Sequence, residues 1–179
     1  LDALNESGQA DNTVIIFTSD HGELLGDHGL YLKGPTHYEN LLRVGMITAG
    51  PGIAVGARVD EPVSTLDLAP TLYDVAGAEA SLELQGSSLL PLMRGEAETR
   101  DFAYNEWNMH PSRTGIALEL RTVRTRTAKL TVDEITGVGE LYDLADDPDE
   151  MVNRFDDPGA SSLRRELEDM IKARPGEIL

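Results

Sequence analysis

The pattern of apolar and polar residues changes near the middle of the chain. In the first part, short apolar runs rich in β-branched residues predict buried strands at residues 13–18 and 44–49. A cap signal predicts a short helix at about residues 37–43, and apolar residues at helical spacing predict a longer one over residues 64–77.

From about residue 100 the chain changes to extended, partly alternating segments joined by short polar connections. They predict an antiparallel meander with strands at residues 101–107, 116–125, 128–132 and 140–144. An amphipathic helix is expected at about residues 160–173. This change of pattern divides the chain into residues 1–98 and residues 99–179.

The first predicted strand is followed at once by residues that can bind a metal ion. Asp20, His21 and Gly22 come at its carboxyl end, the usual ligand crevice of an open α/β sheet. A carboxylate oxygen and an imidazole nitrogen together suit a divalent cation. Lys33 is a compact positive charge able to meet an anionic substrate near that ion. A turn in which Asp20 caps the next helix is the alternative interpretation.

Two further histidines lie in the same stretch. The Asp-His-Gly string repeats at residues 27–29, and in a helix His28 would lie about 10 Å along the axis from His21. The two rings could not then share one ion, so Asp27 and His28 are expected to support the site or the loop, with substrate contact as the alternative. His37 is a candidate for proton transfer, or else a polar residue on the first helical turn.

Composition excludes several kinds of partner. The net charge of −17 argues against nucleic acid and against an anionic membrane surface as partners. No apolar run approaches the length of a membrane span, and the absence of cysteine excludes disulfides and thiolate metal sites. Only three lysines are present, so Lys33 is less expected to be a surface residue without a role. The first residues read as the end of a helix, and we expect the chain to begin within a larger protein.

The second part of the chain carries one basic cluster, whose members are Arg121, Arg124, Arg126 and Lys129. On a strand Arg124 and Arg126 face one way and Arg121 the other. We interpret them as surface residues paired with carboxylates, with substrate contact as the alternative. Residues 146–150 predict a turn that leads into a helix, because Pro148 suits a helix start and the acidic residues after it favour the positive helix end.

Several strings, in order along the chain, resemble the type I sulfatases of the alkaline phosphatase superfamily. They are Ser19-Asp-His-Gly-Glu-Leu-Leu-Gly-Asp-His-Gly-Leu-Tyr-Leu-Lys-Gly-Pro35, the Asp67-Leu-Ala-Pro-Thr-Leu72 helix with the segment at residues 84–95, and Gly139-Glu-Leu-Tyr-Asp-Leu144 with the Asp147-Pro-Asp-Glu150 string. Gly45 departs from the proline that the family usually has there. The resemblance implies an α/β fold, in which residues 1–98 are the C-terminal part of a large mixed α/β sheet domain. It also implies that residues 99–179 form a small α+β subdomain with a short antiparallel sheet.

The same resemblance implies residue roles. Asp20 and His21 would bind a divalent cation such as Ca²⁺, Mg²⁺ or Mn²⁺, and Lys33 would contact the sulfate of a small-molecule sulfate ester. The family nucleophile, a cysteine converted to formylglycine or a serine, lies in a Cys/Ser-x-Pro-Ser-Arg motif far upstream. This chain has no cysteine, so formylglycine is not in it.

A string at residues 109–113 imitates the nucleophile motif but carries Met109 in the attacking position. A thioether cannot attack sulfur or phosphorus as a hydroxyl or thiolate does. We therefore expect the chain alone to be inactive, with Ser112 as the only unorthodox alternative. An apolar strand deprived of its neighbours tends to pair with another chain, so self-association is also expected.

The resemblance predicts the C-terminal portion of a sulfatase-like metallohydrolase. Within the same superfamily the alternative is a phosphonate or phosphate ester hydrolase, because His21 replaces the asparagine commoner among sulfatases. From a different class, the alternative is a non-catalytic interaction domain that retained the fold. It predicts a degenerate nucleophile motif upstream.

Overall fold

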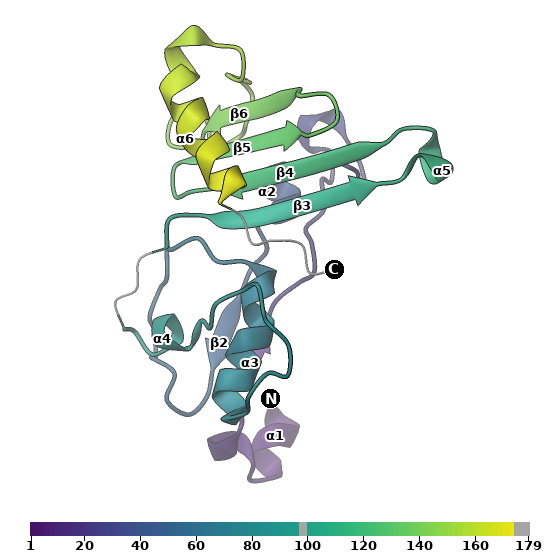
Figure 1. Ribbon diagram of the computed structural model, residues 1–179. Helices are drawn as coiled ribbons and strands as arrows, with labels where there is room; N and C mark the ends of the chain where they lie inside the picture. Colours follow the sequence, from purple (N-terminus) through teal and green to yellow (C-terminus); the bar gives the residue numbers. More distant parts are fainter. Residues whose placement is uncertain (97–99, 174–179) are drawn as a thin grey trace. The chain divides into compact units, whose positions relative to one another are not determined.

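A computed structural model describes residues 1–96 and 100–173, and the chain forms two compact units within it (Figure 1). The first unit comprises Leu1–Asp20, Val44–Asp60 and Thr65–Thr99, and the second comprises His21–Arg43, Glu61–Ser64 and Arg100–Leu179. The expected boundary between residues 98 and 99 lies outside the described residues. Residues 21–43 cluster with the second unit because their hydrogen bonds reach the strands of its sheet.

The first unit contains a two-stranded sheet and short helices. Strand β1 (Ile15–Phe17) pairs antiparallel with β2 (Ile47–Ala49). The helical elements are α1 (Asp2–Glu6), η1 (Ala10–Asn12), η3 (Thr65–Asp67), α3 (Leu68–Ala76) and α4 (Leu90–Met93). The predicted helix at residues 64–77 is confirmed by η3 and α3, which end at Gly77 in the left-handed conformation that suits a glycine cap.

The strands of this unit are shorter and more exposed than the sequence predicts. The apolar run at residues 13–18 predicts a strand buried on both faces, but β1 has three residues and Phe17 is 68% exposed. Opposite it, Ile47 of β2 is 67% exposed. The expectation of burial on both faces is wrong here, because β2 is the only strand paired with β1 among the described residues. Self-association through such an edge stays a prediction.

The second unit is built on a four-stranded antiparallel meander, as predicted. Its strands are β3 (Ala103–Met109), β4 (Leu118–Arg124), β5 (Ala128–Asp133) and β6 (Gly139–Asp143), which pair in sequence order. The helical elements are η2 (Asp27–Gly29), α2 (Glu39–Leu42), α5 (Pro111–Thr114), η4 (Pro158–Ala160) and α6 (Ser161–Lys172). No helix in the described parts of the chain is long and apolar enough to cross a membrane.

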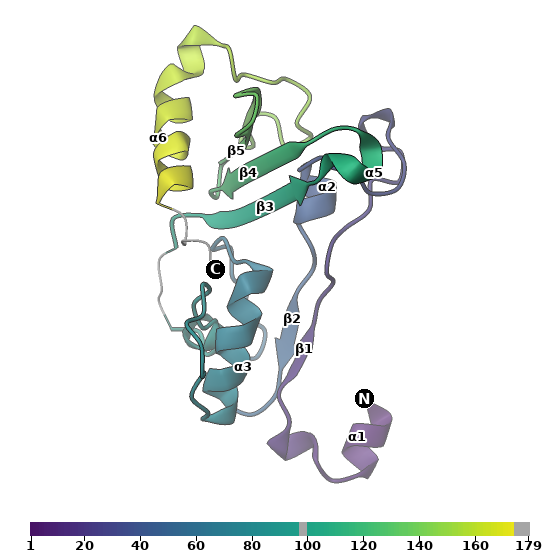
Figure 2. The same ribbon diagram turned by 45° about the vertical axis from the view of Figure 1, so that its right-hand side comes forward.

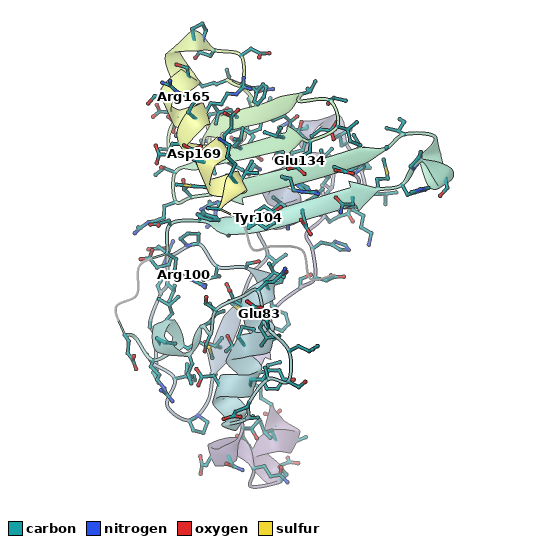
Figure 3. All side chains as sticks on the ribbon, in the orientation of Figure 1. Glu83, Arg100, Tyr104, Glu134, Arg165 and Asp169 are labelled. Atoms are coloured by element: carbon teal, nitrogen blue, oxygen red, sulfur yellow. The ribbon has the colours of Figure 1, made fainter. Side chains whose placement is uncertain are left out.

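Helix α6 covers one face of this sheet and α2 lies on the other side (Figure 2). On one face, under α6, Val123, Leu130 and Leu141 pack with Leu167 and Ile171 in the hydrophobic core. Tyr104 of β3, labelled in Figure 3 beside α6, borders the same core. Residues on a strand alternate between faces, so Thr122, Lys129 and Thr131 lie on the opposite face, toward α2, which is polar.

Arg121 and Arg124 lie on opposite faces of β4, as the strand alternation predicts, whereas Arg126 lies in the connection between β4 and β5. Arg121 is 2% exposed and pairs with Glu134 at 3.1 Å, a residue labelled in Figure 3 at the end of β5. Glu106 and Glu119 also lie within 4.0 Å of its guanidinium. Pairing with carboxylates is therefore observed, but Arg121 is a buried residue and not the surface residue that we expected.

Candidate active site

The ring of His21 connects the predicted metal-binding turn at residues 20–22 to Lys33. Its Nδ1 lies 2.7 Å from the carbonyl oxygen of Gly22, and its Nε2 lies 2.7 Å from Lys33 Nζ. A carbonyl only accepts hydrogen bonds, so this partner assigns the ring proton to Nδ1 and the lone pair to Nε2, which accepts from the ammonium of Lys33. The structure thus brings together two residues that the sequence analysis singled out.

This arrangement fits a metal ligand. Metal-binding histidines commonly donate the second ring N–H to a backbone carbonyl, which orients the ring and fixes the tautomer. His21 has that tautomer, with the lone pair of Nε2 as the ligand atom. The carboxylate of Asp20 is exposed and lies 3.4 Å from the hydroxyl of Ser19. Among residues 1–96 and 100–173, no three His, Asp or Glu side chains are grouped so that they could hold a metal ion.

Gly22 has a steric reason to follow His21. Its N–H donates to the carbonyl of Leu41 at 2.8 Å, so two backbone segments run in direct contact. A Cβ at this position would lie 1.8 Å from the carbonyl oxygen of Asn40, a distance that no side chain can adopt. Only a glycine at this position lets the backbone after His21 approach the backbone at residues 40 and 41.

The loop from His21 to Lys33 carries unusual backbone strain. Leu25, His28 and Leu32 all have positive φ values, between 48° and 65°. Non-glycine residues in this region cost about 1–2 kcal/mol each, and such strain concentrates at functional sites. Three of them within one loop indicate that its path is fixed by more than local preference.

The second Asp-His-Gly string holds the loop in place. The His28 ring stacks on Tyr38, with centroids 3.8 Å apart and an interplanar angle of 10°. Asp27 accepts a hydrogen bond from the side-chain amide of Asn40 at 2.5 Å. These contacts match the supporting role expected for both residues.

His37 is 2% exposed and faces the sheet. Its Nδ1 lies 2.6 Å from the hydroxyl of Thr122 on β4, and its carbonyl accepts from Lys129 Nζ at 2.5 Å. Burial, together with the charge of Lys129, lowers the pKa of His37 to about 4. The imidazole is therefore neutral near pH 7, and proton transfer by His37 stays a prediction.

Comparison with known proteins identifies the family. The family model described as N-sulphoglucosamine sulphohydrolase, C-terminal, matches residues 26–175. The chain belongs to this sulphohydrolase family. The resemblance to sulfatases and the α/β fold predicted from the sequence are thereby confirmed.

Individual relatives of this chain support the same family assignment. It is 36% identical over 172 residues to the Delta 4,5-hexuronate-2-O-sulfatase of Bacteroides thetaiotaomicron, a match covering 93% of the chain and 35% of the relative. The solved structure of a 2-O GAG sulfatase superposes with a TM-score of 0.86 at 32% identity over 96% of the chain and 38% of that structure. The phosphonate monoester hydrolase of Agrobacterium radiobacter gives 0.85 at 29% identity over 96% and 36%. The chain thus spans about a third of the length of its curated relatives.

The burial of Lys129 and its carboxylate partners was not predicted from the sequence. Lys129 is 1% exposed, and it contacts the carboxylate of Glu150 and lies 3.8 Å from Glu39. Burial lowers the pKa of the Lys129 ammonium, while the charges of Glu150 and Glu39 oppose this effect. The available signal was the scarcity of lysine together with the threonines at equivalent positions of neighbouring strands.

The helix start predicted at residues 146–150 is wrong. These residues form a turn, and Glu150 adopts a positive φ of 56°, which a helix does not allow. The carboxylate of Glu150 is used in the buried contact with Lys129, which lies far away in the sequence.

The string that imitates the nucleophile motif makes local contacts. Its serine, Ser112, is exposed, with Oγ 3.0 Å from Nδ1 of His110, the residue before α5. The same ring nitrogen accepts from the N–H of Ser112 at 3.2 Å, so His110 caps this single helical turn.

Proposed function

We propose that the chain is the C-terminal part of a metal-dependent sulfatase. In this proposal Asp20 and His21 supply two of the ligands of a divalent cation, and Lys33 contacts the sulfate of a small-molecule ester. The observation that carries the proposal is the contact of Lys33 with the lone-pair nitrogen of an oriented His21. It sets the two groups side by side. A cation that took the lone pair of Nε2 would displace the ammonium of Lys33, which would then be available to the anionic substrate.

Charge stabilisation is the chemistry assigned to these residues. As the ester bond breaks, negative charge grows on the nonbridging oxygens, and in this proposal the ammonium of Lys33 donates hydrogen bonds to one of them. A bound divalent cation supplies Lewis-acid stabilisation of the same charge. The carbonyl of Gly22 holds the ring of His21 in the ligand tautomer. We place the attacking group in the part of the protein that lies outside this chain.

The two residues predicted to be catalytic receive different roles in the proposal. Lys33 is exposed and able to reach a substrate. His37 is buried against β4 and held neutral by its lowered pKa, so we assign it to fixing the segment after Lys33.

A phosphonate ester hydrolase is the second candidate. Two observations favour it: the histidine at position 21, and the superposition on the phosphonate monoester hydrolase of Agrobacterium radiobacter. Lys33 and a cation would stabilise either anion, because sulfate and phosphonate esters place similar charge on their oxygens.

Steady-state kinetics of the full-length protein test the proposal. We expect turnover of p-nitrophenyl sulfate to exceed that of a phosphonate monoester. Lys33→Ala should reduce kcat by about two to three orders of magnitude, the usual effect of removing one preorganised donor. Lys172→Ala is the matched control, because this lysine is 73% exposed and pairs only within α6.

Three results would contradict the proposal. Wild-type rates in Lys33→Ala would remove Lys33 from the site. Faster turnover of the phosphonate would favour the second candidate. A full-length protein without turnover and with a degenerate upstream nucleophile motif would favour the non-catalytic alternative.

A further inference from the structure

The sheet face opposite α6 is polar and buried at the same time. Thr122 on β4 and Thr131 on β5 are directly paired, with their hydroxyls 2.8 Å apart, and neither is more than 6% exposed. Lys129 on the same face of β5 is 1% exposed. Polar sheet faces normally meet solvent. Here residues 37–39 lie on this face, with His37 bonded to Thr122.

Two charged residues hold the main chain of that segment. Lys129 Nζ donates to the carbonyl of His37 at 2.5 Å and contacts the carboxylate of Glu150. The other oxygen of Glu150 accepts from the backbone N–H of Glu39 at 2.7 Å. Because these bonds are made to the backbone, they fix the path of the chain independently of its side chains. We call Lys129 and Glu150 the clamp.

A second layer of contacts reinforces the clamp. The carboxylate of Glu39 accepts from Arg124 on β4 at 3.0 Å. Between the clamped residues, the hydroxyl of Tyr38 donates to Glu140 on β6 at 3.4 Å. Three consecutive residues, 37–39, are thus each bonded to a different set of side chains in the C-terminal subdomain.

The clamp is costly in free energy. Burying an ion pair removes two charges from water, and an apolar pair of similar size is often no less stable. Glu150 also holds a positive φ of 56°, which is strained for a residue with a side chain. Two such costs at one position indicate that the geometry itself is needed.

The clamped segment supports the loop of the candidate active site. The carbonyl of Leu41 accepts from the N–H of Gly22, whose own carbonyl orients the ring of His21. The ring of His28, within the same loop, stacks on Tyr38. Residues on both sides of Lys33 are therefore held, directly or through one contact, by the clamp.

We propose that Lys129 and Glu150 are positioning residues, which hold the His21–Lys33 loop in its working geometry from the far side of the segment at residues 37–41. The effect on catalysis rests on the proposed function, whereas the effect on the loop does not. The C-terminal subdomain then contributes the placement of His21 and Lys33.

Hydrogen exchange followed by mass spectrometry on the full-length protein tests the clamp. In Lys129→Met we expect amides within residues 21–43 to exchange about tenfold or more faster, because the opening of a segment is governed by its local contacts. Amides of β4 and α6 should exchange as in the wild type. Lys172→Met, at an exposed position, should leave both regions unchanged. Unchanged exchange at residues 21–43 in a folded Lys129→Met protein would overturn the proposal.

A double variant keeps the test decisive if Lys129→Met fails to fold. Lys129→Met/Glu150→Leu removes both charges, so no buried charge is left unpaired. We expect β4 and α6 to regain their protection while residues 21–43 stay fast. Wild-type protection at residues 21–43 in this variant would mean that the charges matter only for stability, and the proposal would be wrong.

Kinetics separate the clamp from the proposed function. The folded variant should lose about 100-fold in kcat on a sulfate ester, the usual effect of a small displacement at a catalytic group, with a smaller change in KM. Fast exchange combined with wild-type kcat would overturn the positioning role. If the wild-type protein hydrolyses no ester, the proposed function fails, and the exchange measurements still decide whether the clamp holds the loop.

Discussion

His37 shows how one residue's surroundings decide its chemistry. In the structure its ring is buried against Thr122, and its pKa is lowered to about 4 by burial and by the charge of Lys129.

The lowered pKa of His37 predicts a pH-dependent stability. The unfolded chain binds a proton at this residue near pH 6.5, whereas the folded chain binds it only near pH 4. Between these values the unfolded state holds more protons, so this contribution is fully present above pH 6.5 and is lost as the pH falls toward 4. We expect the free energy of unfolding to decrease by about 2 kcal/mol from this group between pH 7 and pH 5.

Chemical denaturation of wild type and His37→Asn at pH 7 and pH 5 measures this contribution of His37 to the free energy of unfolding. Asparagine can keep the hydrogen bond to Thr122 but does not titrate. The stability difference between the two proteins should therefore narrow at pH 5. A difference that stays constant between the two pH values would show that His37 does not titrate as stated.

At the scale of elements, the spacing of apolar residues predicted the strands and the helix that bury an apolar face. The meander and α6 were predicted because one face of each is apolar, and Val123, Leu130 and Leu167 meet in the core. The buried polar face was not predicted, because Lys129 alternates with apolar residues as a solvent-facing residue would. Its cover comes from residues 37–39, which lie about ninety positions earlier in the sequence.

The contact of Gly22 with the start of α2 makes a prediction at the same scale. In Gly22→Ala the new Cβ would overlap the carbonyl oxygen of Asn40, so the two backbone segments must separate. We expect a loss of about 1–3 kcal/mol in stability, the range for overpacked sites. On the proposed function, the full-length variant should also lose most of its turnover of a sulfate ester. Gly34→Ala is the matched control, because a Cβ there meets nothing within 4 Å. Equal stability and activity of the two variants would contradict the steric account.

At the scale of the molecule, the chain supplies a pair of candidate metal ligands and a cationic residue. Both His21 and Lys33 belong to the segment that packs on the C-terminal sheet. Asp20, His21 and Lys33 could be proposed from sequence because they follow a predicted strand and match a family string. The strand burial at residues 13–18 was mispredicted, because β1 pairs only with β2 among the described residues. The chain spans about a third of its curated relatives, so we expect the remaining ligands and the nucleophile to come from the rest of the protein.

The metal content of the full-length protein tests the central claim most directly. Elemental analysis by mass spectrometry should find a divalent cation in the wild type and in Lys33→Ala, because Lys33 is assigned to the substrate. The cation should be lost, or retained at well below stoichiometric amounts, in Asp20→Ala and His21→Ala, since each removes one ligand from a small set. A wild-type protein that holds no divalent cation, or variants of Asp20 and His21 that keep it in full, would contradict the account.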